Sequence, residues 1–199
     1  MSHTLSARRV VEPTVEPLTL SAVKLHLRVD GNDENGLIHS LITTARILCE
    51  QHGWLSCCTQ TWRVYVSSWP QTPLLLPRHP IQSISSIKYF DAADAEHTLS
   101  SSIYVLTPAP GLDAYLSLAA DQNWPSESLS TRRYPIEIEY VAGFGDESSV
   151  PRTIKQWMLL QIGTMFEQRE AVQIVPGVSN SIKMDFVDGL LDEYRGFRY

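Results

Sequence analysis

Three cysteines and a histidine are the side chains in this sequence whose types and spacing come closest to a metal site. Cys49 and His52 lie one helical turn apart, and Cys57 and Cys58 follow a few residues later. Zinc sites usually use ligand pairs that are better separated, and two adjacent cysteines in a strand point to opposite faces. We therefore interpret the cysteines as small buried hydrophobic residues and His52 as a residue at a helix end. We expect no metal and no cofactor.

Two groups of carboxylates could also do chemistry, as a cation site or as an acid-base pair. The group Asp91, Asp94 and Glu96 lacks the glycine and the distal glutamate of a calcium loop. The alternation around Glu137 and Glu139 is typical of a strand with one face toward solvent. We interpret both groups as solvated surface.

Known catalytic patterns are absent from the sequence. It holds no Gly-x-Ser-x-Gly motif, and Gly143-Phe-Gly145 is not followed by the glycine and lysine of a phosphate-binding loop. The histidines form no ordered acid-base series: His3, His26, His39, His52, His79 and His97. We expect no catalytic residues, with an enzyme whose site forms only by spatial convergence as the remaining alternative.

Length and composition predict one folded protein with a single core, or a core with a smaller appended unit. The chain has 199 residues, of which 43% are hydrophobic and 19% are charged. Its formal net charge of −6 argues against sequence-independent binding of nucleic acid, since phosphate binding needs clustered cations. No apolar run reaches the roughly 18 residues of a membrane span. An odd number of clustered cysteines is typical of synthesis in a reducing cytoplasm.

Two long amphipathic helices should position the core. We expect a short helix with Ser21 as its N-cap, then a helix that Asp33 caps and Gly53 ends. A late helix should begin at Pro151 and pack on the second one. Apolar residues at three- and four-residue steps predict the packing surfaces, with these central members: Leu37, Leu41, Ala45, Leu48, Ile154, Met158, Ile162 and Met165.

Between these helices the period of the pattern changes to that of strands. Alternation predicts strands over 60–67, 84–90, 97–106, 112–118 and 134–141, with a short extended segment at 74–76 and a hairpin turn at 91–96. The fold class is therefore α+β, a small helical bundle with an inserted antiparallel β-sheet unit. We divide the chain into a flexible N-terminal arm or extended strand (1–16), a helical core (17–57 and 146–171), the inserted β unit (58–145), and a C-terminal loop and tail (172–199).

Several short segments follow one another in a characteristic order and spacing: Leu-Ser-x-x-Lys-x-His-Leu-Arg-Val-Asp at 20–30, Asp33-Glu34, Thr-Gln-Thr-Trp at 59–62, Pro-Ile-x-Ser-Ile-x-Ser-Ile at 80–87, Tyr-Val-Ala-Gly-Phe-Gly at 140–145, Pro-x-x-Ile-Lys at 151–155 and Glu-x-Arg-Glu at 167–170. Through the order and spacing of these segments, the sequence from about Pro17 to Tyr199 resembles the head-tail connector (adaptor) family of tailed double-stranded DNA bacteriophages and prophages.

The resemblance implies a structural protein of the virion neck, made in the host cytoplasm. It implies a homo-oligomeric, typically dodecameric ring between the portal protein and the tail-completion (stopper) protein, with DNA only passing through the lumen and no membrane contact. Another tail-completion or tail-tube protein remains an alternative. Such a protein would share the β-rich middle but would not need the paired amphipathic helices.

The C-terminal tail is the candidate binding segment. Aromatic residues and arginine are enriched at interfaces, and the resemblance implies that this segment reaches toward the portal. The portal-binding candidates are Tyr194, Arg195, Phe197, Arg198 and Tyr199. The alternative is a tail that folds back on its own core.

Overall fold

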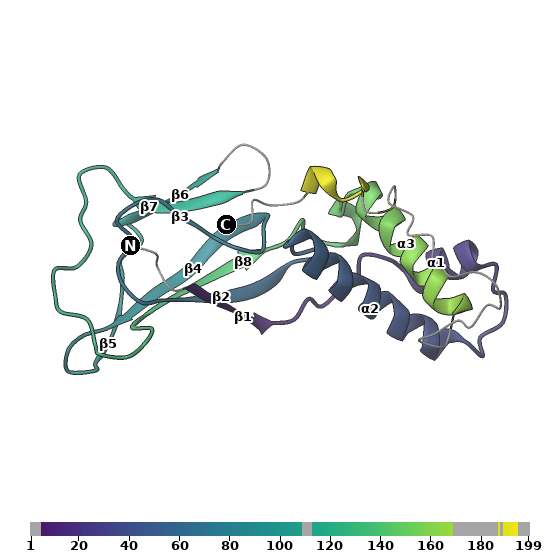
Figure 1. Cartoon of the computed structure of the whole chain (residues 1–199), viewed down its shortest axis with the longest axis horizontal. Helices are drawn as coiled ribbons and strands as arrows, with labels where there is room; N and C mark the ends of the chain where they lie inside the picture. Colours follow the sequence, from purple (N-terminus) through teal and green to yellow (C-terminus); the bar gives the residue numbers. More distant parts are fainter. Residues whose placement is uncertain (1–4, 109–112, 169–186, 188, 195–199) are drawn as a thin grey trace, which may run out of the picture. The chain divides into compact units, whose positions relative to one another are not determined.

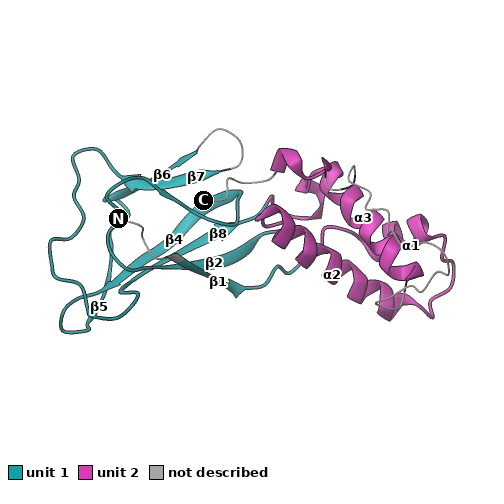
Figure 2. Cartoon of the chain, viewed as in Figure 1, with its two compact units in different colours: residues 1–14, 59–143 teal, residues 15–58, 144–199 magenta. Residues whose placement is uncertain are grey.

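The computed structural model describes residues 5–108, 113–168, 187 and 189–194. Within them it has three α-helices, two short 3-10 helices and eight strands in two antiparallel sheets (Figure 1), so the α+β class is confirmed. The chain divides into two compact units (Figure 2). The β unit comprises residues 1–14 and 59–143, and the helical unit comprises residues 15–58 and 144–199.

The helical unit contains α1 (Leu20–Leu27), α2 (Asn35–Gly53), α3 (Arg152–Glu167), η1 (Glu147–Ser149) and η2 (Asp192–Tyr194). The predicted caps of the first two helices are wrong. Thr19, whose backbone is extended, caps α1 by accepting a hydrogen bond from the Ala22 N–H at 3.2 Å. Glu34 precedes α2 without a side-chain cap bond. The predicted end of α2 at Gly53 is confirmed, and Trp54 follows in the left-handed conformation with φ of 55°.

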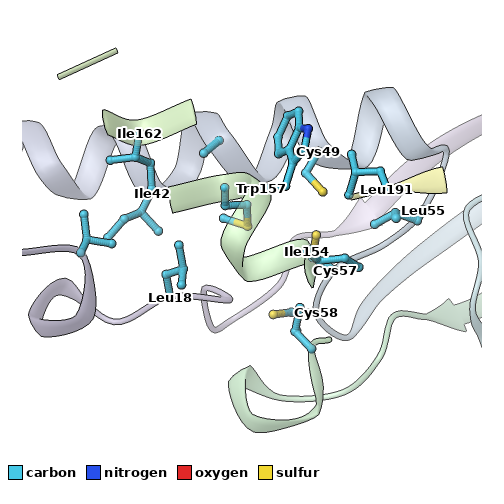
Figure 3. Close-up of a cluster of buried hydrophobic side chains, with 14 of the residues drawn as sticks. Leu18, Ile42, Cys49, Leu55, Cys57, Cys58, Ile154, Trp157, Ile162 and Leu191 are labelled. Atoms are coloured by element: carbon cyan, nitrogen blue, oxygen red, sulfur yellow. The ribbon is translucent and has the colours of Figure 1, made fainter. Parts of the chain in front are cut away.

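The core of the helical unit forms where α2 and α3 face each other, which confirms the predicted packing of the two helices (Figure 3). Its buried side chains come from all three helices and from the segments that flank them: Leu18, Val23, Ile38, Ile42, Ala45, Cys49, Leu55, Cys57, Cys58, Val150, Ile154, Trp157, Met158, Ile162, Val187 and Leu191. Apolar groups from distant parts of the chain thus close over one another.

The predicted core residues differ in how deeply they are buried. Ala45, Ile154, Met158 and Ile162 are buried, and two others pack against the cluster while partly exposed, namely Leu41 and Met165. Leu37 is only half-buried, and Leu48 is 39% exposed. Neighbouring helix positions are about 100° apart, so these two leucines lie on a flank of α2, beside the face that carries Ile38 and Cys49. The apolar face predicted for α2 was therefore too wide.

The β unit contains two sheets. The first has the order β1-β2-β8-β4-β5 and is built from β1 (Leu5–Val11), β2 (Gln60–Val66), β8 (Ile136–Ala142), β4 (Ile81–Phe90) and β5 (Glu96–Thr98). The second has the order β3-β7-β6 and is built from β3 (Leu74–Leu75), β7 (Ala114–Leu118) and β6 (Tyr104–Pro108). Alternate residues of β2 and β8 are buried, as the period-two pattern predicts.

Two segments of the β unit differ from the sequence-based expectation. Residues 5–11, interpreted there as part of a flexible arm or an extended strand that orders on a neighbour, form a strand that pairs along β2 of the same chain from Leu5↔Val66 to Val11↔Thr61. The single strand expected over 97–106 is two strands in different sheets, because the chain turns away at 99–103 between β5 and β6. The hairpin turn at 91–96 is confirmed, and the Asp91 carboxylate accepts hydrogen bonds from the N–H groups of Ala93 and Ala95.

Candidate interaction surfaces

The three cysteines belong to the core of the helical unit, where each is a free and fully buried thiol. A hydrogen bond to Cys49, together with burial, raises the pKa of the Cys57 thiol, and burial raises the pKa of Cys58 to about 12. His52 instead stacks on Trp157, with 6.1 Å between the ring centroids. No cluster of three or more metal-ligating side chains occurs among the residues that the structure describes.

The raised thiol pKa values make the helical unit sensitive to alkali. Unfolded cysteines lose their protons near pH 8.5, whereas folding holds Cys57 and Cys58 in the protonated form. Above that pH the unfolded chain binds fewer protons than the folded chain, so the free energy of unfolding should fall as pH rises. Urea unfolding at pH 7, 9 and 10 measures this. The variant Cys58→Ala should show a smaller fall, and an equal fall would contradict the assignment.

A buried ionic network connects three segments of the helical unit. The Arg46 Nε donates to Glu16 Oε2 at 2.8 Å, and its Nη1 donates to Glu50 Oε2 at 3.2 Å. The other Glu50 oxygen accepts from the Cys57 N–H at 3.1 Å, and Thr43 Oγ1 donates to Glu16. Burial lowers the pKa of Arg46, but the hydrogen bond to Glu16 and the charges of both glutamates outweigh it and raise the pKa. The network ties the segment before α1 to α2 and to the turn after it.

The carboxylates at the β4–β5 hairpin are paired separately, so they do not converge on one cation. Asp91 Oδ2 lies 2.8 Å from His97 Nε2, and this hydrogen bond holds the pKa of Asp91 below its usual value. Asp94 binds Ser130 and Arg132, and Glu96 pairs with Lys88 at 2.7 Å.

Glu137 and Glu139 flank one arginine on the face of β8 opposite to its buried residues. Arg63 of β2 donates to Glu137 Oε2 at 3.1 Å and to Glu139 Oε2 at 2.7 Å. Opposite charges on neighbouring strands therefore attract each other on this face. Both glutamates thus form ion pairs with one arginine.

Several apolar side chains are exposed, and none of them was predicted from the sequence to be exposed. Leu25 of α1 is 82% exposed, because it lies on the side of the helix away from the buried Val23. In the β unit the exposed apolar residues lie at sheet edges, with Val10 and Val11 on β1 and Val105 on β6. The exposure of Leu25 could have been predicted from its position in the helix relative to Val23. The exposure of residues at the sheet edges depends on the strand order, which the sequence does not give.

Among the candidates for portal binding, Tyr194 is the one that lies within the described residues. It sits in η2, partly buried against the helical core. Thr153 Oγ1 and the Tyr194 hydroxyl form a hydrogen bond of 3.2 Å, and the tyrosine ring meets Phe144 edge-on. Tyr194 therefore anchors the end of the described chain to α3. The other candidates lie outside the described residues: Arg195, Phe197, Arg198 and Tyr199.

Among the described residues, no helix combines the length and the apolar character needed to cross a membrane.

Among known proteins, the chain is similar in structure to several solved chains. No family model matches the chain, and no curated protein matches it. A chain in the neck of the empty gene transfer agent (GTA) particle, computed with C6 symmetry, superposes with a TM-score of 0.77 at 20% identity, covering 98% of this chain and 97% of that one.

Two further solved structures give the same result. A chain of the virion of the native GTA particle matches with a TM-score of 0.77 at 21% identity, covering 97% of this chain and 96% of that one. A chain in the neck of the native particle, computed with C12 symmetry, matches at 0.71 and 19% identity, covering 98% and 97%. This protein thus shares its fold, over almost its whole length, with chains from the neck and virion of gene transfer agent particles.

Proposed function

We propose that the protein is a head-tail connector (adaptor) of a tailed phage, prophage or related particle. In this role it forms a ring in the virion neck between the portal protein and the tail-completion (stopper) protein, and DNA passes through the lumen. The observation that carries the proposal is the likeness in fold over 98% of the chain to a chain of a GTA neck, with a TM-score of 0.77. The sequence resemblance to adaptors supports the same role.

Reactive side chains of the protein make their contacts within the subunit, which supports a structural role. The thiols fill the helical core, Arg46 joins two carboxylates there, and the carboxylates at the β4–β5 hairpin pair with cations. Side chains bound in this way stabilise the subunit and leave its surfaces for contacts with neighbours. A net charge of −6 is also consistent with DNA that slides past without being held.

A ring requires each copy to use two different patches, one for each neighbour. A chain with the same fold occurs in a neck computed with C12 symmetry, which supports a ring of twelve copies. We assign portal binding to the C-terminal tail, where Tyr194 is anchored on α3 and is followed by the four remaining candidates: Arg195, Phe197, Arg198 and Tyr199.

Deletion of the gene tests the proposal. Without an adaptor the portal has no surface for the stopper, so the lysate should contain capsids and unattached tails, with infectious or transducing titre reduced to background. Electron microscopy of the lysate counts joined and unjoined particles. Expression of the intact gene in trans should restore joining. Normal joining in the deletion strain would overturn the proposal.

A further inference from the structure

The five-stranded sheet of the β unit has two open edges. At one end, β1 pairs with β2, and no described strand pairs with its other side. At the other end, β5 pairs only with Lys88–Phe90 of β4. The outer side of residues 81–86 of β4 therefore has no strand partner in the described part of the chain. Figure 1 shows β2 and β8 between β1 and β4.

Both edges can take another strand. An unpaired strand edge presents a row of backbone N–H and C=O groups, which is a template for another chain. The β1 edge is seven residues long and carries two exposed valines, Val10 at 44% and Val11 at 50%. The open part of β4 spans six residues, and its exposed side chains are uncharged: Gln82, Ser83 and Ser85. The two edges differ in length by one residue, and no like charges oppose each other.

We infer that β1 of one copy pairs with residues 81–86 of β4 in the next copy, so that the five-stranded sheets continue from subunit to subunit. The inference rests on the proposed ring. A contact between the two opposite edges of one sheet is head-to-tail, as a cyclic assembly requires, and it pairs both of these edges in every copy when the ring closes. A two-fold contact between two β1 strands would stop at a dimer and would leave every β4 edge open.

Irregularities in both strands restrict how the edges pair. The register of β1 shifts between Arg9 and Val11, and that of β4 shifts between Ile81 and Ser83 and again between Ile84 and Ser86. Bulges bend and twist an edge, so they disfavour stacking of many copies as a flat sheet and leave pairing to a correctly placed neighbour. The subunit can therefore stay soluble before assembly and still pair in the ring.

Engineered cysteines test this contact in particles made with the full-length chain. The exposed Ser6 of β1 receives a cysteine together with one at Ser83 or Ser85 of β4, as Ser6→Cys/Ser83→Cys and Ser6→Cys/Ser85→Cys. The three native thiols are fully buried and should not react. After mild oxidation with copper phenanthroline, a non-reducing denaturing gel should show most of the protein of at least one double variant as a ladder of multimers.

The single variants are the matched controls, and each should stay monomeric on the same gel. Dimers from Ser6→Cys alone would show a two-fold contact between β1 strands and would overturn the inference. If the protein is present in the neck but neither double variant forms multimers, the strand pairing is overturned while the adaptor function stands. If the protein is absent from particles, the proposed function fails and the pairing fails with it.

Discussion

Replacement of Arg46 by methionine should lower the free energy of unfolding of the helical unit by about 3–5 kcal/mol. Arg46 and Glu50 have side-chain exposures of 5% and 4%, so loss of the guanidinium removes the Arg46 cation from a buried carboxylate. The desolvation of the Glu50 charge would then be offset to a smaller extent. Methionine keeps most of the aliphatic volume, which makes the lost charge the main change. Urea unfolding followed by far-UV circular dichroism measures the effect.

Two further variants separate the buried charge from general damage. Arg63 also bridges two glutamates, but its side chain is 32% exposed, so Arg63→Met should cost only about 1 kcal/mol or less. The double variant Arg46→Met/Glu50→Gln removes both buried charges and keeps an acceptor for the Cys57 N–H, so it should recover part of the loss. Equal costs for Arg46→Met and Arg63→Met would contradict the role assigned to burial.

Deletion of residues 196–199 should abolish attachment to the portal and leave the melting temperature unchanged. The deleted segment, Gly-Phe-Arg-Tyr, holds most of the aromatic and arginine anchors proposed for the contact. Loss of interface anchors of this kind removes most of a binding free energy. The cut lies beyond Tyr194, so the hydrogen bond to Thr153 and the contact with Phe144 remain. Co-sedimentation with purified portal measures attachment.

Two controls sharpen the tail experiment. A tail of the same length with Gly-Ser-Gly-Ser at 196–199 should also fail to attach, because side chains and not chain length supply the contact. Tyr194→Phe removes a hydroxyl that bonds within the subunit and keeps the ring, so it should attach normally. Attachment of the deletion variant to the portal would contradict the assignment of portal binding to the C-terminal tail.

The parts of the fold that depend on local pattern were predictable. The period of α2 located Ile42, Ala45 and Cys49 on a buried face, and alternation located Val64 and Ile138 on the buried face of the five-stranded sheet. A helix or strand that buries one face carries apolar residues at the period of that element, so the sequence of one segment is enough to predict its buried face. The end of α2 at Gly53 was equally local.

The parts that depend on distant partners were not predictable. The strand β1 has two arginines and pairs with residues fifty or more positions away, so its own pattern gave little indication of a strand. The ionic network joins Glu16 to Arg46 across thirty positions. One signal for it was present, because Arg46 lies four residues after Ile42 on the apolar face of α2, and a charge on such a face needs a buried partner. The edges of the sheet likewise follow only from strand order.

Cryo-electron microscopy of the particle neck tests the central claim most directly. The account predicts a symmetric ring of this chain next to the portal, into which the helical unit and the β unit both fit, with a central channel for DNA. A neck reconstruction at side-chain resolution whose ring next to the portal is built from a different polypeptide would contradict it.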